Sequence, residues 1–481
     1  MRHPIHRREV LRLAAGLASL AAVGCSSRER QDASTPTVAS AGTPASSTPG
    51  GTEREVRSTN GLLKTTLSIA PMMVPFNGST RWALTVNGQT PGPTLVARPG
   101  DHLSLTLENK SGASTNLHTH GLGVSPSGTA DNPFIEVKNG QSYTYEIDIP
   151  ASHPGGTFWY HPHFHHHVAE QLFAGFFGLI VVEDAIDQLP AIAGAVQRSL
   201  LLHDTRIGST EAAVMRTTQM DTRNGREGEV LVTGWRSPKF DGKTAELERW
   251  RILNASPSRF YRLALDKHQL SVIATDGGRI AAPVLMDELT LVPGERVELL
   301  VRHDSAGTFQ LKSLPVDRGS MAGTSTVALA SFVVKDTGTP PSLPGSLASF
   351  ESLKTRTAAK VRELTFSMQG QMGGARFLID GREFDAGRVD IAVQAGTTED
   401  WVIRNTSPMD HPFHLHVWPF QLIDQPSGSH SPDGWKDVVN VPANRTVTVR
   451  IPFDKIKGKT VFHCHILDHE DMGMMGVVEV S

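Results

Sequence analysis

Alternating apolar and polar residues recur in short runs from about residue 60 to the C-terminus. Residues 102–107 and 143–149 are two such runs, and glycine, proline and asparagine residues separate runs of this kind. A period of two is typical of strands that bury one face, and the longer period of amphipathic helices is scarce in this chain. Asn87-Gly88, between apolar flanks, favours a tight hairpin turn. The pattern therefore predicts an all-β fold made of β-sandwiches.

An internal repeat and the chain length together indicate how many sandwiches there are. Residues 250–257 read Trp-Arg-Ile-Leu-Asn-Ala-Ser-Pro, and residues 401–408 read Trp-Val-Ile-Arg-Asn-Thr-Ser-Pro. Both lead into a further apolar strand, but histidines follow only the later copy. A chain of 481 residues is long enough for about three domains. We expect domains at 59–185, 186–345 and 346–481, with the middle one a spacer that has no metal ligands and forms one wall of the substrate approach.

The N-terminal part of the chain is predicted to direct and tether the protein. Within a signal segment at 1–25, residues 7–11 resemble a twin-arginine export motif. Residues 22–25 resemble a lipoprotein processing box, which would lipidate Cys25; an ordinary signal peptide with an incidental cysteine is the alternative. Residues 26–58, rich in Ser, Thr, Pro, Ala and Gly, are expected to be a flexible linker. We expect an extracytoplasmic protein, in the periplasm or at the cell surface, held to a bacterial membrane only through Cys25.

Composition narrows the class of protein further. The formal net charge is -3 and the pI is about 6.7, so no broad basic field is available to attract nucleic acid. The only cysteines are Cys25 and Cys464. If Cys464 is a metal thiolate, no disulfide framework remains, and stability must come from hydrophobic cores. We expect a monomer.

The most informative segment is 463–474, which offers soft and borderline metal ligands in an order that suits copper. Side chains alternate along a strand, so Cys464 should point one way while His463 and His465 point the other. A thiolate, two imidazoles and a weak axial thioether define a blue-copper centre, and His469 and Met474 follow Cys464 closely. The remaining histidine should come from elsewhere, and His411 in the segment 411–416 is the natural candidate.

Three further histidine pairs have spacings that place both imidazoles on one side of an extended segment. Together with His411 and the C-terminal motif they hold ten of the 21 histidines. A lone His-x-His pair is a weak signal, but several such clusters beside a Cys-His-Met loop favour metal binding. The pairs are His118 and His120, His161 and His163, and His414 and His416.

These four motifs resemble, in order and spacing, the copper signatures of the multicopper oxidases, the family that includes laccases, cuprous oxidases and bacterial copper-tolerance oxidases. The resemblance extends from about residue 60 to the C-terminus and implies three tandem cupredoxin-like Greek-key sandwiches with four coppers. The type 1 copper would take His411, Cys464, His469 and, axially, Met474. The type 2 copper would take His118 and His414, one type 3 copper His120, His161 and His465, and the other His163, His416 and His463.

The resemblance also implies the activity. A donor would give single electrons to the copper at Cys464, and these would cross to a three-copper cluster, enclosed by the first and last domains, where dioxygen is reduced to two waters. Reduction of dioxygen consumes protons, so buried carboxylates near the cluster are expected to relay them. Glu470 and Asp131 match acidic positions with that role in similar oxidases. For each acid, a solvated loop carboxylate is the alternative.

The donor is left open among phenols, aromatic amines and metal ions. A dedicated cuprous oxidase is less favoured, because the last domain has only scattered methionines such as Met368 and Met372. A two-domain copper nitrite reductase is disfavoured by chain length and by the two type 3 motif pairs. A non-enzymatic envelope scaffold of the same fold would be expected to have lost ligands, whereas every ligand position is present here.

Several neighbouring residues have more than one possible role. The run at 165–167 could help to load metal or line a solvated loop. Asp410 could orient His411, contact a donor or serve as a turn residue. Met472 and Met475 flank the axial candidate and could fill core space.

Overall fold

The computed structural model describes residues 55–319, 325–370, 374–426, 432–454 and 456–481. The predicted signal segment, Cys25 and most of the predicted linker lie outside the described residues, as does Met372. The last residues of that linker do not behave as a tether, because Glu55–Arg57 form strand β1 and pair in parallel with β4. The linker therefore ends earlier than expected.

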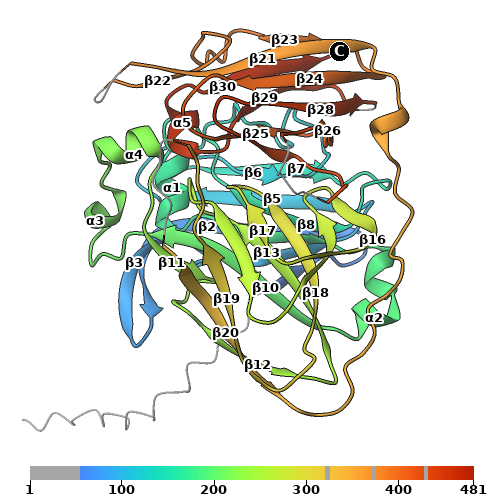
Figure 1. Cartoon of the computed structure of the whole chain (residues 1–481). Coiled ribbons are helices and arrows are strands. Elements are labelled where there is room, and N and C mark those ends of the chain that lie inside the picture. The colour runs from blue at the N-terminus through green and yellow to red at the C-terminus, as the bar shows by residue number, and fades with distance from the viewer. Residues whose placement is uncertain (1–54, 320–324, 371–373, 427–431, 455) are drawn as a thin grey trace, which may run out of the picture. The chain divides into compact units, whose positions relative to one another are not determined.

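The described chain folds into six sheets, two for each of three sandwiches, so the predicted all-β fold is confirmed (Figure 1). The first sandwich has the sheet orders β3-β2-β5-β7 and β1-β4-β9-β8-β6. Its further strands are β2 Leu62–Phe76, β3 Ser79–Val86, β4 Thr94–Ala97, β5 His102–Asn109, β6 His118–His120, β7 Ser142–Asp148, β8 Gly156–His161 and β9 Gly178–Val182.

The second sandwich, green to yellow in Figure 1, has the orders β11-β10-β13-β18-β15-β16 and β12-β20-β19-β14-β17. Its strands are β10 Val196–Thr205, β11 Glu229–Val232, β12 Lys239–Lys243, β13 Leu247–Asn254, β14 Tyr261–Leu265, β15 Leu270–Thr275, β16 Gly278–Met286, β17 Leu289–Leu291, β18 Arg296–Arg302, β19 Gly307–Leu314 and β20 Val327–Lys335.

The third sandwich, orange to red at the top of Figure 1, has the orders β22-β21-β24-β28-β26 and β23-β30-β29-β25-β27. Its strands are β21 Lys360–Gln369, β22 Arg376–Ile379, β23 Ile391–Val393, β24 Thr397–Asn405, β25 His411–Leu415, β26 Gln421–Asp424, β27 Val438–Val441, β28 Thr446–Phe453, β29 Gly458–Cys464 and β30 Met475–Val480.

Helices are short and lie between strands. They are α1 Val168–Ala174, η1 Ala185–Gln188, α2 Pro190–Ala193, α3 Glu211–Met215, α4 Gln219–Asn224, η2 Leu353–Thr355 and α5 Leu467–Asp471. Within the described part of the chain, none is both long and apolar enough to cross a membrane.

Each sandwich has its own apolar core, and a further buried cluster joins all three. That cluster brings Trp159 of the first sandwich together with Leu253 of the second and Leu467 of the third. Burial of apolar surface stabilises such contacts by about 25 cal/mol per Å². The three sandwiches are thus held in register, which a site shared between them requires.

The repeat found in the sequence has three structural copies. Asn254 and Asn405 end β13 and β24, and each side-chain amide donates to two backbone carbonyls while its oxygen accepts the N–H of the serine two residues on. Asn109 ends β5 and does the same, with the N–H of Ser111 as donor. The asparagine closes the turn after a central strand in every sandwich.

The strand register supports the same conclusion. β5, β13 and β24 each pair in parallel with an early strand of their own sandwich, β2, β10 and β21. In every case the asparagine is the last residue of the paired stretch, opposite Ile69, Leu202 or Phe366. The sandwiches are therefore repeats of one unit, and the repeat in the first was not visible in the sequence because no Trp precedes Asn109 at the matching place.

We expect Asn254→Ala to lower the free energy of unfolding of the central sandwich by about 2–4 kcal/mol, because two buried carbonyls and one buried N–H would lose their partner. Guanidinium unfolding followed by circular dichroism measures the change. Asn139→Ala is the matched control: Asn139 is exposed and accepts only the Gly112 N–H. Equal losses in the two variants would contradict a structural role for the repeat.

Candidate metal centres

Two strand pairs from different sandwiches carry most of the candidate ligands. In the first sandwich β6 pairs with β8, which sets His118 opposite His161. In the third sandwich β25 pairs with β29, which sets His414 opposite His463 and Phe413 opposite Cys464. Because side chains alternate, each strand pair presents its imidazoles on one face. The two faces meet, and the ligands from both ends of the chain come together.

The smaller centre consists of His411, Cys464 and His469, all with no exposed surface. The sulfur of Cys464 lies 3.4 Å from His411 Nδ1 and 3.8 Å from His469 Nδ1, and the two nitrogens lie 3.3 Å apart. Met474, the predicted axial ligand, is fully buried in the same core cluster, and its carbonyl accepts the Cys464 N–H. His469 lies on α5 rather than in a loop.

Partners on the outer side fix both imidazoles of this centre. His469 Nε2 donates to the carbonyl of Arg223 at 3.0 Å, and His411 Nε2 lies 2.7 Å from Ser407 Oγ. These contacts leave both Nδ1 atoms facing the sulfur. Burial lowers the pKa of His411 to about 3 and raises the pKa of the Cys464 thiol. Two neutral imidazoles beside a thiol form a donor set that suits a soft cation, whose binding would release the thiol proton.

The larger centre contains the remaining eight candidate histidines, which fall into overlapping sets of three with mutually close nitrogens. The sets are His118, His120 and His414; His120, His161 and His465; and His163, His416 and His463. The same strand serves both centres, because Cys464 belongs to the smaller one while His463 and His465 belong to the larger. The side chains of residues 463–465 therefore alternate between the two centres, as predicted.

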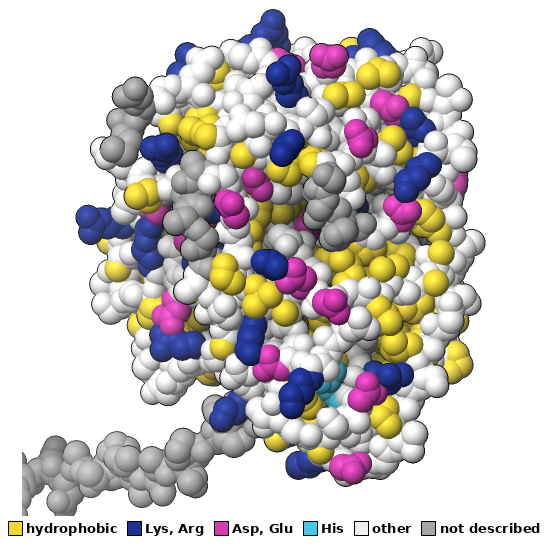
Figure 2. All heavy atoms as spheres, viewed as in Figure 1, with side chains coloured by type: hydrophobic (Ala, Val, Ile, Leu, Met, Phe, Trp, Pro, Cys, Tyr) yellow, Lys and Arg dark blue, Asp and Glu magenta, His cyan; other side chains and the backbone are white. Residues whose placement is uncertain are grey.

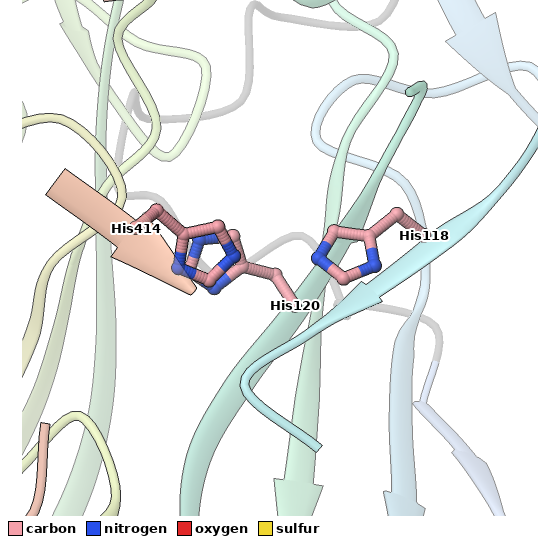
Figure 3. Close-up of side chains that lie close together, drawn as sticks. All are labelled: His118, His120 and His414. Carbon is pink, nitrogen blue, oxygen red and sulfur yellow. The ribbon is translucent and has the colours of Figure 1, made fainter. Parts of the chain in front are cut away.

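Rings from the first and third sandwiches stack against each other at this centre. His120 lies on His414 with ring centroids 3.9 Å apart, and His118 lies beside them (Figure 3). His118 in turn stacks on His416 at 3.8 Å. The Nε2 atom of His163 lies 3.1 Å from that of His463 and 3.0 Å from that of His416.

Several rings have one nitrogen that forms a hydrogen bond with protein and an inner nitrogen that has no partner. His161 Nδ1 donates to the Pro162 carbonyl, and His414 Nδ1 donates to the Asp437 carbonyl. His118 Nδ1 donates to Asp131. The Nε2 atoms of these three rings, and those of His120 and His465, have no hydrogen-bond partner although they are buried. Buried polar atoms without partners are uncommon in proteins, so their convergence indicates a cation-binding site.

Electrostatics support metal binding at the larger centre. Burial, and next the proximity of His414, lowers the pKa of His120 well below its usual value. Burial does the same for His161 and His465. Neutral rings carry a free lone pair, which is the form that binds a metal. The donor sets therefore fit transition-metal ions, and the all-imidazole centre and the thiolate centre both suit copper.

The two predicted acids both lie at the larger centre. Asp131 is buried and also accepts the Thr119 N–H, so it fixes the orientation of His118 from behind. Glu470 is fully buried, with carboxylate oxygens 3.1 Å from His463 Nδ1 and 3.4 Å from His163 Nε2. Burial raises the pKa of Glu470 well above its usual value. Neither acid is a solvated loop carboxylate.

Sequence reasoning missed a contribution from the central sandwich. The Arg296 side chain is fully buried and forms two hydrogen bonds with Asp437, at 2.6 and 2.7 Å. It also lies 3.4 Å from His120 Nδ1 and donates to the Thr157 carbonyl of the first sandwich. The central sandwich therefore contributes directly to the environment of the larger centre and is more than a spacer.

The loop that carries Arg296 approaches the centre closely. Gly294 has a φ of +86°, and a Cβ there would lie 2.8 Å from His465 Nε2. The Asp437 carboxylate accepts hydrogen bonds from Arg296, and the Asp437 backbone carbonyl accepts one from His414. The only sequence signal was a Pro-Gly pair ahead of a charged strand, which does not identify a partner.

All three histidines of the run at 165–167 contact other protein groups. His166 Nδ1 donates to the Asp471 carbonyl, His167 pairs with Glu170, and His165 packs on Phe384 beside a cavity of about 160 Å³ that His163 also lines. The run is therefore partly packed rather than a solvated loop.

Asp410 behaves as a turn residue, because its carboxylate accepts from the Asn440 side chain and the Ala443 N–H. Met472 packs against the core of the third sandwich, and Met475 belongs to a small buried cluster beside it. Both methionines therefore fill core space.

Three multicopper oxidase family profiles match this chain, at residues 68–187, 201–330 and 355–481. Among curated relatives, the multicopper oxidase mco of Staphylococcus haemolyticus is 30% identical over 405 residues, which cover 82% of this chain and 83% of that protein. The cell division protein FtsP of Yersinia pestis is 27% identical over 429 residues, which cover 83% of this chain and 85% of that protein.

Solved structures of two bacterial oxidases are also similar. The multicopper oxidase of Campylobacter jejuni, described as a metallo-oxidase, has a TM-score of 0.79 at 32% identity and covers 88% of this chain and 92% of its own. The laccase-like multicopper oxidase CueO of Ochrobactrum sp. is described as active towards lignin model compounds and lignosulfonate. It has a TM-score of 0.78 at 28% identity, and the match covers 89% of this chain and 99% of that chain.

We expect Arg296→Gln to lower copper retention at the larger centre, because Asp437 would be left buried without its cation and could no longer hold His414 in place. Breaking one side of a buried pair costs about 3–5 kcal/mol. Elemental analysis after loading and dialysis measures the copper content, and thermal unfolding measures the stability. The smaller centre should keep its copper.

Arg249→Gln is the matched control for this prediction. Arg249 is a buried arginine of the same sandwich that pairs with Glu298 and Asp187. Its loss should destabilise the fold without selective loss of copper. If both variants lost copper in proportion to their loss of stability, Arg296 would have no specific role at the centre.

Proposed function

This chain belongs to the multicopper oxidase family, and we propose that it is a laccase-like oxidase that couples one-electron oxidation of a small donor to reduction of dioxygen to water. The observation that carries the proposal is the strand at 463–465, whose alternating side chains join a thiolate centre to a centre of eight histidines. Two such centres, one beside the other, suit chemistry that collects single electrons and uses several together.

We propose four copper ions per chain, held by the residues expected from the sequence. The type 1 ion would be held by His411, Cys464, His469 and Met474. The type 2 ion would be held by His118 and His414, and the type 3 ions by His120, His161 and His465 and by His163, His416 and His463. Bound copper would supply one-electron redox chemistry at the smaller centre and four-electron reduction of dioxygen at the larger one.

The protein around the candidate copper ligands connects the two centres and orients the ligand side chains. Cys464 is covalently continuous with His463 and His465, so the backbone of three residues connects the two centres. Outer partners such as Asp131 and the Asp437 carbonyl hold the rings before any ion binds, which lowers the cost of ordering them. The candidate ligands are buried almost completely, which limits the access of bulk water to both centres.

Protons for dioxygen reduction are proposed to come through Glu470. Its carboxyl lies beside His163 and His463 and has no hydrogen-bond partner in the described structure, so it can hold a proton and release it towards the centre. Asp131 is proposed to act mainly by holding His118, since its oxygens are already occupied by two donors.

We also propose that the protein works outside the cytoplasm, attached through a lipid on Cys25. The twin-arginine motif and the processing box in the sequence support this placement. Export of folded protein suits an enzyme that must bind its metal correctly. We further propose that the protein is a monomer and that its electron donor is a small molecule or a metal ion.

The similarity to cell division proteins raises a role without oxidase turnover as the second candidate. The convergence of the eleven predicted histidine and cysteine ligands, with Met474 buried in the same core cluster as Cys464, favours the oxidase, because a scaffold would not need them. Copper content together with oxygen uptake on a phenol, and then on cuprous ion, separates the two. Copper binding without oxygen uptake on any donor would favour the second candidate.

Cys464→Ser is expected to abolish the blue charge-transfer absorption and the oxidase activity while leaving the fold intact, because the surrounding sandwich holds the strand. Absorption spectra, oxygen uptake and circular dichroism measure these effects. Cys25→Ser, which removes the other cysteine, should leave the colour unchanged. Turnover by the Cys464 variant would rule out the proposed use of this residue.

Glu470→Gln is expected to slow oxygen reduction about 100-fold, within the range of general acid–base contributions, while reduction of the blue absorption by a donor keeps its rate. Anaerobic and aerobic stopped-flow measurements separate the two steps. Glu170→Gln, on the nearby helix α1, is the control and should affect neither. Equal slowing of both steps by Glu470→Gln would remove the proton-relay assignment.

A further inference from the structure

The electron-accepting edge of the smaller centre is sealed by protein. Neither His411 nor His469 has exposed surface, so no donor can touch either ring. The outer nitrogen of His411 ends on Ser407, which is itself buried. The outer nitrogen of His469 ends on the backbone carbonyl of Arg223, whose side chain is half-buried and therefore reaches solvent. One layer of chain separates His469 from solvent on that side.

That layer comes from the central sandwich and is held firmly. Arg223 lies near the end of α4, which packs against α5, the helix that carries His469 (Figure 1). Arg226 donates to Asp468 through its backbone N–H at 2.8 Å and through its guanidinium at 2.9 Å, with both side chains buried. The segment is thus fixed over the centre by the residue next to His469.

A glycine makes the close approach possible. Gly225 has a φ of +79°, and a Cβ there would lie 2.2 Å from Ser258 Cβ and 2.8 Å from Ile466 Cγ2. A side chain at this position would push α4 away from α5. The segment 219–226, which covers His469, is therefore an integral part of the fold. A donor must transfer its electron across this segment.

The face of the His469 ring that Phe377 covers offers no second route for an electron from the surface. Phe377 stacks on the ring with centroids 3.9 Å apart and is fully buried. A larger cavity of about 390 Å³ reaches Asp410 at the seam between the second and third sandwiches, but the Asp410 carboxylate holds Asn440 and Ala443 rather than His411. The carbonyl of Arg223 is the direct connection from the ring towards the surface.

The cover is positively charged at this point. Residues 206–226 contain four arginines and two acids, and the buried acid Asp221 is paired with Arg206. Asp468 is occupied by Arg226. No ion pair of the described structure includes Arg216 or Arg223. Basic side chains project at the left edge of Figure 2, where Figure 1 places α3 and α4.

We propose that α4 is the electron-entry surface and that Arg223 selects small anionic one-electron donors, such as phenolates with further acidic groups or anionic metal complexes. This inference rests on the proposed oxidase function and names its donor class. Each donor loses one electron, and four such oxidations with four protons reduce one dioxygen to two waters. The positive charge raises the local concentration of anions beside the Arg223 carbonyl that His469 contacts.

Two substitution-inert complexes of opposite charge test the proposal, ferrocyanide and hexaammineruthenium(II). Anaerobic stopped-flow follows bleaching of the blue absorption of the copper-loaded protein by each complex at low and high salt. Arg223→Gln should slow ferrocyanide about threefold to tenfold at low ionic strength, with less effect at high salt, and should not slow the cationic complex. Arg223→Lys should retain the preference for the anion.

Lys239→Gln is the matched control. It removes the same charge from β12 of the same sandwich, far from α4 in Figure 1. Unchanged copper content and melting temperature should accompany both variants. Equal effects of Arg223→Gln on the two complexes, or an effect no larger than that of Lys239→Gln, would overturn the proposal. An unmodified protein with no bleachable absorption would instead contradict the oxidase function itself.

Discussion

Ten imidazoles and one thiol are buried in this molecule with many of their inward atoms unpaired, and the rest of the structure is arranged around that constraint. A buried polar atom without a partner costs about 1–3 kcal/mol, so such a set persists only if the surrounding fold is rigid or a cation completes it. Rigidity comes from three separate cores and from the cluster around Trp159, Leu253 and Leu467 that joins them. Outer hydrogen bonds on several rings, such as His161 and His414, then favour the tautomer that leaves the inner lone pair free.

The ligands were predictable from sequence because strand geometry is local. Cys464 and its neighbours had to point to opposite faces, and each His-x-His pair had to share one face, whatever the distant packing. The chain length predicted three sandwiches, and the internal repeat supported that number. The repeat at Asn109 escaped notice because only the asparagine and the serine two residues on are shared with the other copies.

The residues that were missed depend on contacts between sandwiches. Arg296 lies 141 residues before its partner Asp437, and Arg226 lies 242 residues before Asp468. No local pattern distinguishes these arginines from surface ones, since their burial follows only from the way three domains pack. The expectation that the middle domain is a spacer was incomplete for the same reason. It has none of the copper-ligand candidates, yet it supports both centres, one through Arg296 and the other through α4.

The asparagine-closed turn has a consequence for the history of the chain. In the first and third sandwiches the residues after this turn lead into a metal-binding strand, and in the second they lead into β14 with no histidine. Tandem duplication of one ancestral unit, with ligands gained or erased on an unchanged scaffold, accounts for this arrangement. The central unit thus preserves the architecture in which a designer could install an additional redox cofactor.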